Sequence, residues 1–538
     1  MDASSEMLGH YDYIVVGSGS AGGVLANRLA SSQQHRILLL EAGPKDVNPM
    51  IHMPGGTAEV VKNKRLNWAM DSEPQRHLDH RRLAQPRGKM LGGSSNINGM
   101  VAIRGNAACY DHWAALGNQG WGYRELLPHF KSIETWCNGQ PSEFHGDRGE
   151  CRINPTTFDN PLLERFVQAG RELGLPANDD FNGRCQEGSG RYHANVHRGQ
   201  RQGTSKAFIA PLRGRSNVRI ETGVLVEKVL LEGGKAVGIQ ATRKGRALHF
   251  RANKEVILCA GAFNTPQLLM LSGIGNRAKL EPLGIALQHH LPGVGENLQD
   301  HLSLLMNYPC SEPYSMNGIA NSAWAKLKVA ADYFIRKRGP ASHNMVEVGA
   351  FCHSMAGLPA PDIQLHLMPT LMYNLTDTPP DQHGVSVRAC NLTPLSRGVV
   401  ELHSADPQQQ PKIDFRFLSD PRDLPVLLTA FRTVERLMQA KAWGGIIGPE
   451  TKGGSDCHND DAIHAFIRAY VGTDYHPVGT CKMGQDEMAV VDNQLKVHGI
   501  DGLRVADASI MPTIVRGNTN LPCMMIGDKC AQLILAQT

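Results

Sequence analysis

The sequence Tyr11-Asp-Tyr-Ile-Val-Val-Gly-Ser-Gly-Ser-Ala-Gly22 decides the fold of this chain. It opens with a short run of apolar, β-branched residues, which predicts a buried parallel strand. Apolar residues at helical spacing follow the glycines up to Ala30, and a second apolar run, Ile37-Leu-Leu-Leu40, ends at Glu41. A strand, a glycine turn, a helix and a strand within about 30 residues predict a βαβ unit.

The glycines of this unit have the spacing Gly17-x-Gly19-x-x-Gly22, which is typical of a dinucleotide-binding turn. Gly17 permits the tight turn, Gly19 lets the backbone approach a pyrophosphate, and Gly22 lets the helix pack on the strand. The N–H groups at the helix start would bind the pyrophosphate, and Glu41 would accept hydrogen bonds from a ribose. A βαβ unit of this kind fits NAD as well as FAD. The alternative to a dinucleotide site is an ordinary glycine-rich turn with Glu41 exposed to solvent.

The composition is that of a folded globular protein without a strong charge bias. The length of 538 residues predicts about two to four domains. The 55 Lys and Arg residues oppose 51 Asp and Glu residues, and the net charge of +4 gives no reason to expect a nucleic-acid partner. The 12 cysteines include no C-x-x-C pair and no zinc-ligand spacing. We therefore expect no metal site and reduced thiols in a cytosolic compartment.

The ends of the chain favour a cytoplasmic location. Residues 1–10 lack the basic and long apolar regions of a signal peptide. No apolar run reaches the roughly 18 residues that would predict a membrane span. We therefore expect a cytoplasmic protein.

The features of a nucleotide-binding domain return in the middle and at the end of the chain. Gly233-Gly234 predicts a hairpin turn, and an apolar helix is predicted over 521–536. The segment from about 305 to 474 is less patterned. This distribution predicts a discontinuous nucleotide-binding domain and a second domain built from the insertions. The predicted strands are 218–220, 224–231, 236–242, 255–259 and 503–506.

The segment Gly88-Lys-Met-Leu-Gly-Gly-Ser-Ser-Asn-Ile-Asn98 is a second candidate for ligand binding. The backbone N–H groups of Gly92 to Ser95 can form an anion nest, and Asn98 can contact a ring edge. A surface turn is the alternative, because such a density of glycine and serine is common in turns.

Two segments near the C-terminus contain candidate catalytic residues. In Tyr475-His-Pro-Val-Gly-Thr480 the proline fixes the backbone beside His476, which suits a ring that must be held in place. A single histidine is nevertheless more often a structural residue. Asn518 and Asn520 precede the apolar C-terminal helix, so that either of them is also a candidate N-cap.

Several long motifs occur together along the whole chain. Besides those above they include Gly261-Ala-Phe-Asn-Thr-Pro-Gln-Leu-Leu-Met-Leu-Ser-Gly-Ile-Gly275 and Val294-Gly-Glu-Asn-Leu-Gln-Asp-His301. With these motifs the chain resembles the glucose–methanol–choline (GMC) oxidoreductases, which are FAD-dependent alcohol dehydrogenases and oxidases. Within that family it is similar to bacterial dehydrogenases of aliphatic alcohols, choline, polyethylene glycol and sorbose.

The resemblance implies an α/β (α+β) fold with two domains. One is a discontinuous Rossmann-like FAD-binding domain, formed by residues 1–159, 211–304 and 475–538. The other is a substrate-binding domain built on a β-sheet with flanking helices, formed by residues 160–210 and 305–474.

The resemblance also implies the roles of individual residues. His476 aligns with the catalytic base of the family, and Asn518 aligns with the second active-site position. Some members tether FAD covalently through a histidine at the position of Ile97, so that the isoleucine implies non-covalent binding. The positions that align with FAD contacts are Gly17, Gly19, Ser20, Ala21, Gly22, Glu41, Ala42, Leu91, Gly93, Ser94, Asn98, Gly99, Met100, Val101, Val226, Ala260, Tyr475, Asp507, Ala508, Thr519 and Asn520.

The implied reaction is oxidation of an alcohol to an aldehyde or ketone by hydride transfer to flavin N5. Neutral His476 would take the hydroxyl proton, and the Asn518 amide would hold the alkoxide oxygen. We expect a quinone or an artificial acceptor to receive the electrons. An oxygen-using oxidase and a lyase of the same fold are alternatives. An NAD-dependent reductase would leave the segments 92–98 and 475–480 unexplained, and a non-catalytic flavin protein would not need both His476 and Asn518.

Residues 322–339 predict a basic amphipathic helix. Trp324, Leu327 and Phe334 belong to one apolar face, and lysines and arginines follow on the remaining positions. Such a helix either packs on the substrate-binding domain with a solvated basic side or lies on a membrane surface. The second interpretation would place the protein peripherally on the inner face of the cytoplasmic membrane, within reach of a quinone.

Overall fold

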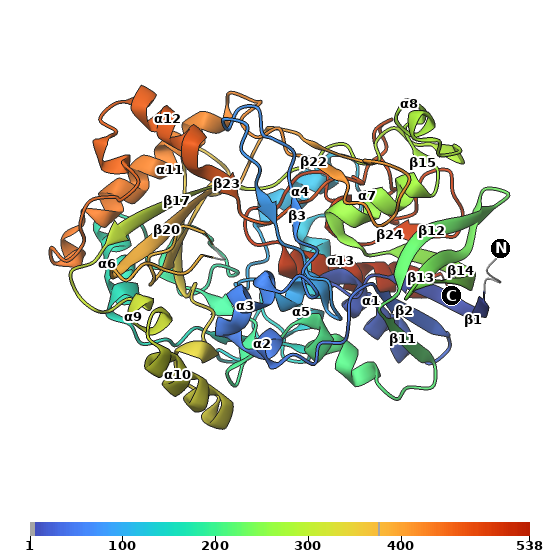
Figure 1. The fold of residues 1–538 in the computed structure, drawn as a ribbon, viewed down its shortest axis with the longest axis horizontal. Helices are drawn as coiled ribbons and strands as arrows, with labels where there is room; N and C mark the ends of the chain where they lie inside the picture. Colours follow the sequence, from blue (N-terminus) through green and yellow to red (C-terminus); the bar gives the residue numbers. More distant parts are fainter. Residues whose placement is uncertain (1–5, 375–376, 538) are drawn as a thin grey trace.

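The computed structural model describes residues 6–374 and 377–537, which form a mixed α/β fold around two large β-sheets. Residues 1–5, part of the N-terminal segment considered above, lie outside the described residues. The two sheets lie in opposite halves of the molecule (Figure 1). The predicted fold class is confirmed.

The first sheet has seven strands and is centred on β1 (Glu6–Val16). This strand pairs in parallel with β2 (Ile37–Glu41) on one side and with β14 (Arg246–Leu258) on the other. The strand order is β11-β2-β1-β14-β13-β12, and β24 pairs with β14. The remaining strands are β11 (Val218–Thr222), β12 (Leu225–Glu232), β13 (Lys235–Arg243) and β24 (Leu503–Val505).

Most of the predicted elements of this sheet are confirmed. Gly233 and Gly234 have φ angles of 57° and 80° and form the turn between β12 and β13, because only glycine adopts this backbone without strain. The first strand begins earlier than predicted, at Glu6 rather than at Tyr11. The first residues of β1 pair with the first residues of β14. They do not form an apolar run, so the apolar pattern alone does not predict this part of the strand.

Two helices next to the first sheet pack against one another. They are α1 (Ser20–Ser31), which follows the glycine turn, and α13 (Asn520–Leu535), which confirms the predicted C-terminal helix. A Cβ atom on Gly527 would lie only 2.3 Å from the carbonyl oxygen of Ala21. Glycine at this position therefore lets α13 approach the start of α1 backbone to backbone.

The second sheet has six strands in the order β23-β17-β20-β19-β18-β7, and every neighbouring pair is antiparallel. The helices α6 (Pro161–Glu172), α11 (Asp423–Met438) and α12 (Asp460–Tyr470) pack against it. The strands are β7 (Gly188–Arg191), β17 (Leu302–Pro309), β18 (Val348–Cys352), β19 (Ile363–Met368), β20 (Gly384–Asn391) and β23 (Val471–Thr473).

The first sheet uses strands only from the segments predicted to bind FAD, and the second sheet draws on both insertions. The expected boundary between 304 and 305 falls inside β17, which belongs wholly to the second sheet. The domain boundaries themselves stay a prediction.

The remaining helices and short strands surround the two sheets. No helix among the described residues combines the length and the hydropathy that a membrane span requires. All twelve cysteines lie in the described part of the chain and carry free thiols. The other elements are α2 (Pro49–His52), α3 (Thr57–Lys62), α4 (Ala107–Ala115), α5 (Tyr123–Ile133), α7 (Gly261–Leu271), α8 (Arg277–Leu280), α9 (Asn317–Ala320), α10 (Ala323–Arg336), β3 (Met70–Asp71), β4 (Ala84–Gln85), β5 (Glu134–Trp136), β6 (Cys151–Pro155), β8 (His193–Ala194), β9 (Val196–His197), β10 (Gln200–Arg201), β15 (Ile274–Gly275), β16 (His289–His290), β21 (Val399–Glu401) and β22 (Lys412–Asp414).

Candidate active site

A cavity of about 1050 Å³ is lined by residues of both sheets. This volume is at the upper end of the range of about 300 to 1,000 Å³ that is usual for ligand pockets. Both predicted catalytic residues, His476 and Asn518, line it. The predicted cofactor contacts that also line it are Gly17, Gly19, Ser20, Ala21, Glu41, Ala42, Gly93, Ser94, Asn98, Gly99, Met100, Val101, Val226, Ala260, Tyr475, Asp507, Ala508, Thr519 and Asn520.

The three glycines of the first turn have different surroundings. A Cβ atom on Gly17 would lie 2.4 Å from the carbonyl oxygen of Cys259, and one on Gly22 would lie 2.0 Å from the carbonyl oxygen of Gly17. Gly19 instead has no neighbouring atom within 4 Å of such a Cβ and faces the cavity. A ligand can therefore approach the backbone at Gly19. Gly22 and Leu91 are the two predicted contacts that do not line the cavity.

The end of the cavity near this turn offers polar groups that suit a dinucleotide. Gly19 is the N-cap of α1 and provides no side chain for the first-turn N–H groups, which leaves them free for a phosphate. The buried Nδ2 of Asn520 has no hydrogen-bond partner, while its Oδ1 accepts a hydrogen bond from Ser20 Oγ. Such a buried donor requires a partner. The residues present therefore fit the pyrophosphate of FAD.

Glu41 lies at the carboxyl end of β2, on the cavity wall. Its carboxylate accepts hydrogen bonds from the hydroxyl of Ser18 and from the N–H of Gly43. Burial raises the pKa of Glu41, although these hydrogen bonds oppose the shift. The carboxylate is thus held rigidly beside the glycine turn, where a ribose hydroxyl is expected if the turn binds a dinucleotide.

Most of the glycine-rich segment at 92–98 is buried, and only Ser94 and Asn98 are half-buried, so the interpretation as a surface turn is wrong. The predicted anion nest also needs correction. The N–H of Gly92 donates to Ser18 Oγ at 3.0 Å, and the N–H of Gly93 donates to the carbonyl of Met90 at 2.7 Å. Both donors are therefore used within the protein, and the segment contacts the cavity through Gly93, Ser94 and the residues from Ile97 onwards.

His476 and Asn518 also line the cavity and lie beside one another. Nε2 of His476 lies 3.3 Å from Nδ2 of Asn518. The helix α13 begins with Thr519 as its N-cap, without a capping side chain, so the interpretation of Asn518 or Asn520 as the N-cap is wrong. The Asn518 side chain instead points toward the imidazole ring.

The backbone that carries His476 is fixed on both sides. Tyr475 has a φ angle of 65°, a strained value for a residue with a bulky side chain. Its N–H donates to Thr473 Oγ1 and its carbonyl accepts from the guanidinium of Arg87. The N–H of His476 donates to Asp300 at 2.8 Å. These bonds hold the imidazole in one position.

The hydrogen bonds around His476 define which ring nitrogen carries the proton. His301 Nε2 faces the carbonyl oxygen of Val515 at 3.0 Å, and a carbonyl can only accept. Burial and the neighbouring His476 lower the pKa of His301 to about 3, so His301 is neutral and its Nδ1 is an acceptor. Nδ1 of His476 lies 3.0 Å from that acceptor and must carry the proton. Nε2 of His476 is therefore unprotonated and faces Asn518.

A second series of hydrogen bonds orients the Asn518 amide. The hydroxyl of Tyr192 donates to the carbonyl of Leu365 at 2.9 Å, so it accepts from Nε2 of Gln364. The same Gln364 amide donates to Oδ1 of Asn518 at 3.2 Å. Asn518 consequently turns its NH₂ group toward His476, where it can also bind a substrate oxygen.

A buried ion pair lies beside this centre. Nη1 of Arg388 lies 2.8 Å from Oδ1 of Asp474, and Oδ2 of Asp474 lies 3.4 Å from Nδ1 of His476. Burial alone would raise the pKa of Asp474, but His476, Arg388 and His366 hold it well below its usual value. Asp474 is thus an acceptor that supports the same tautomer of His476.

Burial lowers the pKa of His476 despite the opposing effect of Asp474, and Arg87 and Arg388 contribute to the lowering. The imidazole is therefore neutral at neutral pH, as a general base requires.

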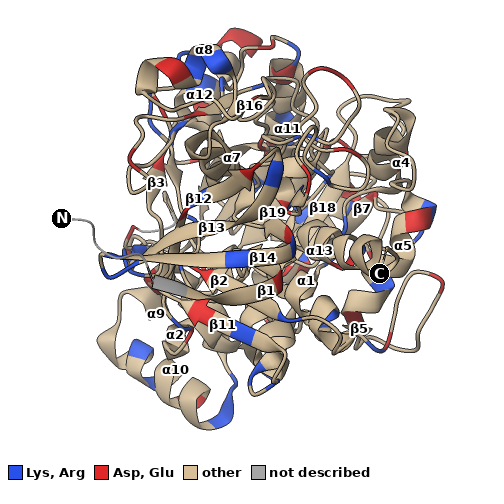
Figure 2. Ribbon diagram, turned by 90° about the vertical axis from the view of Figure 1, so that its right-hand side faces the viewer, with Lys and Arg blue, Asp and Glu red and all other residues tan. Residues whose placement is uncertain are grey.

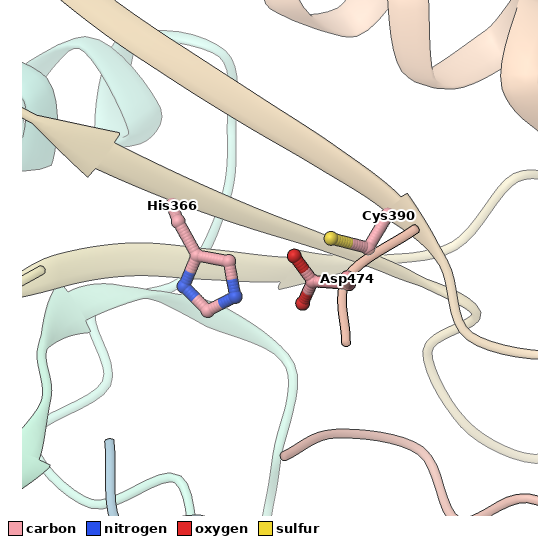
Figure 3. A group of neighbouring side chains, drawn as sticks. All are labelled: His366, Cys390 and Asp474. Atoms are coloured by element: carbon pink, nitrogen blue, oxygen red, sulfur yellow. The ribbon is translucent and has the colours of Figure 1, made fainter. Parts of the chain in front are cut away.

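Figure 3 shows His366, Cys390 and Asp474 with their side chains converging, and their potential ligand atoms lie within 4.8 Å of one another. The ion pair with Arg388 already neutralises Asp474, and burial raises the pKa of the Cys390 thiol well above its usual value. A protonated thiol and a paired carboxylate do not suit a metal ion. The chemistry of this cluster is that of a buried ion pair.

The residues that position His476 and Asn518 were not identified from the sequence. His301 ends a motif that carried the resemblance, and this was the one signal that pointed to it. Gln364 and Arg388 belong to the less patterned segment from about 305 to 474, and Tyr192 lies in the other predicted insertion, 160–210. Asp474, two positions before the base, lies on the other side of the predicted domain boundary between 474 and 475.

The chain is similar to known proteins over nearly its full length. The model of the GMC oxidoreductase family matches residues 11–303 with its N-terminal part and residues 394–527 with its C-terminal part. The chain is 42% identical to an oxygen-dependent choline dehydrogenase of Photobacterium profundum over 98% of this chain and 93% of the relative. It is also 42% identical to an alcohol dehydrogenase (acceptor) of Pseudomonas putida, over 98% and 96% of the two chains.

Solved structures are similar over nearly the full length as well. The crystal structure of pyridoxine 4-oxidase from Mesorbium loti has a TM-score of 0.88 and 29% identity, covering 97% of this chain and 98% of that chain. A formate oxidase has a TM-score of 0.92 and 27% identity, covering 99% of both chains.

Proposed function

Because the chain belongs to the GMC oxidoreductase family, whose members act on CH–OH donors with FAD, we propose that it oxidises an alcohol with His476 as the catalytic base. The observation that carries this proposal is the pair formed by the unprotonated Nε2 of His476 and the NH₂ group of Asn518, 3.3 Å apart on the wall of the cavity. Both groups face the space in which a substrate hydroxyl would lie.

The residues of this chain perform the proton transfer and the positioning. Nε2 of His476 takes the hydroxyl proton, while the amide N–H of Asn518 donates to the oxygen on which negative charge develops. FAD, when bound, supplies the hydride acceptor at its N5 atom. Removal of the base typically lowers such a rate by about 10²- to 10⁴-fold.

We propose that FAD binds without a covalent link. Ile97 lines the cavity at the position where some relatives have a tethering histidine, and its side chain has no nucleophilic nitrogen. The backbone N–H groups at the start of α1, the unpartnered Nδ2 of Asn520 and the carboxylate of Glu41 would hold the dinucleotide.

We propose an apolar alcohol as the substrate rather than a quaternary ammonium alcohol such as choline. The Asp474 carboxylate next to the base is neutralised by Arg388, so this carboxylate is not available to bind a cation. The walls contributed by the second sheet, α9, α10 and their connections are mainly thioether and aliphatic groups, and unbranched methionines adapt well to a flexible chain. These walls include Met316, Ile319, Ala320, Val329, Ala330, Met345, Val346, Met368 and Met372.

We propose a quinone or another non-oxygen compound as the electron acceptor. The name of the Pseudomonas putida relative refers to an acceptor without specifying it, whereas the names of the Photobacterium profundum relative and of the structural relatives refer to oxygen or to oxidases. An oxygen-using oxidase is therefore the second candidate, and a lyase of the same fold is the third.

An anaerobic titration of the purified holoenzyme tests the substrate class and the reaction together. The panel should contain a long-chain aliphatic alcohol, choline, a polyol and an aromatic alcohol. We expect the aliphatic alcohol to bleach the flavin at the lowest concentration. Preferential bleaching by choline would contradict the substrate assignment, and failure of every alcohol would favour the lyase. Reoxidation by quinone but not by air then supports the dehydrogenase.

A further inference from the structure

The helix α10 (Ala323–Arg336) exposes an apolar face to solvent. The exposed fractions are 75% for Trp324, 60% for Leu327, 44% for Phe334 and 79% for Ile335. These positions, together with Ala331, follow a spacing of three and four residues and therefore form one stripe. Tyr333 is the one buried residue of the helix. Of the two interpretations of this helix, packing of its apolar face on the substrate-binding domain therefore does not hold at these exposed positions.

Basic residues flank this stripe, except Lys326, which lines the cavity. The segment 323–338 contains five of them, Lys326, Lys328, Arg336, Lys337 and Arg338, against the single acidic residue Asp332. Its net charge of +4 equals the net charge of the whole chain, so the rest of the chain has no net charge. Blue segments along α10 are visible in Figure 2. Large apolar groups beside an excess of positive charge match the boundary between acyl chains and anionic headgroups.

The opposite face of α10 belongs to the cavity wall. Lys326, Val329, Ala330 and Phe334 line the cavity, while Trp324, Leu327 and Ile335 do not. Phe334 therefore lies where the stripe meets the cavity wall. The helix lies at the lower margin of the molecule in Figure 1, outside both sheets. One helix therefore separates the substrate cavity from the exposed apolar stripe.

We propose that α10 docks on an anionic lipid bilayer, with Trp324, Leu327 and Ile335 inserted at the headgroup boundary and the basic residues on the phosphates. A second copy of the chain fits this surface less well, because a twofold contact between two α10 helices would bring the two positive segments together. Docking would place the cavity wall against the phase into which apolar alcohols and quinones partition. This benefit rests on the proposed function, whereas docking itself does not.

Sedimentation of the FAD-loaded enzyme with phosphatidylglycerol vesicles, and separately with phosphatidylcholine vesicles, tests the proposal. At low salt we expect the enzyme to bind the anionic vesicles at least tenfold better, and high salt should weaken this binding. The double variant Trp324→Asp/Ile335→Asp should lose the binding. The control Val47→Asp/Met355→Asp, which changes two other exposed apolar residues, should retain it.

A charge variant tests the basic flank independently of the stripe. Lys328→Glu/Arg336→Glu should weaken binding to anionic vesicles, while the control Arg148→Glu/Arg184→Glu, at exposed positions elsewhere, should not. Flavin absorbance and turnover of a water-soluble alcohol should be unchanged in all four variants, which separates this test from that of the proposed function. Absence of binding to either vesicle, or equal binding by the Trp324→Asp/Ile335→Asp variant, would overturn the proposal. So would a dimer in solution that this variant dissociates, because a second copy would then cover the stripe.

Discussion

Nδ1 of His301 lies 3.0 Å from Nδ1 of His476, and the proton between them belongs to His476. The direction of this bond follows from the carbonyl of Val515, which obliges His301 to donate from Nε2. The carbonyl of Val515 thus fixes the tautomer of the proposed base through His301, which does not line the cavity. In the proposed mechanism His301 is a positioning residue, which leaves Nε2 of His476 free.

Replacement of His301 should therefore impair catalysis without weakening substrate binding. In His301→Ala we expect kcat to fall by about 10²-fold, within the range for loss of general-base function, with KM little changed. His301→Asn places an amide oxygen near the position of Nδ1 and should restore part of the rate. An equal loss in both variants would indicate that His301 supports the fold rather than the tautomer.

The pH dependence of kcat/KM should reflect the lowered pKa of His476. Since the base acts in its neutral form, kcat/KM should be constant at neutral pH and fall at a pH below the ordinary histidine value of about 6.5. Asp474 favours the protonated ring, so Asp474→Asn should move this acidic limb to still lower pH. Asp486→Asn, at a surface ion pair with Lys482, is the control and should leave the limb in place. Movement of the limb to higher pH in Asp474→Asn would contradict the assignment.

Removal of one partner of the buried Arg388–Asp474 pair should also destabilise the protein. Asp474→Asn leaves the Arg388 guanidinium buried without its counter-ion, which typically costs about 3 to 5 kcal/mol. We expect a lower midpoint of thermal unfolding than in Asp486→Asn, measured on the holoenzyme. An unchanged midpoint would show that solvent or another group compensates the charge.

Three buried histidines should make the fold sensitive to mild acid. Burial lowers the pKa of His301 to about 3 and the pKa values of His193 and His366 to about 4. In the unfolded chain each takes up a proton near pH 6.5, so the unfolded state binds more protons below this value. Stability is therefore fully present above about pH 6.5 and falls as the pH decreases toward 4, by up to roughly 1.4 kcal/mol per unit and histidine.

The measurement is the denaturation midpoint at pH 7 and at pH 5. His366→Gln should reduce the difference between the two, whereas the exposed His77→Gln should not. A pH difference that His366→Gln leaves unchanged would mean that other groups cause the acid sensitivity.

Denaturation should release the flavin. Because Ile97 offers no nitrogen for a covalent bond, acid precipitation of the yellow holoenzyme should leave all flavin absorbance in the supernatant. Flavin fluorescence that stays with the protein band on a denaturing gel would contradict non-covalent binding and would require another attachment residue.

The first sheet was predictable because its signals are local. The apolar run before Gly17, the glycine spacing and the Gly233-Gly234 turn each act over a few residues, and all three correspond to observed elements. The outer part of β1 was missed because backbone pairing with β14, not apolar burial, defines it.

The residues that orient His476 and Asn518 were not predictable, because their contacts join distant positions. His301 and His476 are 175 positions apart, and Gln364 and Asn518 are 154 apart. No spacing rule relates such residues, since β17, β19 and the C-terminal segment meet only in the folded protein. The amphipathic pattern of 322–339 was likewise evident, but the sequence alone could not decide whether its apolar face is buried.

The central claim is that His476 removes the substrate proton, and anaerobic rapid mixing tests it most directly. Wild type, His476→Ala and Asn518→Ala, each loaded with FAD, are mixed with an alcohol that bleaches the wild-type flavin. We predict that His476→Ala retains its flavin and is reduced about 10²- to 10⁴-fold more slowly, with partial recovery as the pH rises. Reduction of the His476→Ala flavin at the wild-type rate would contradict the claim.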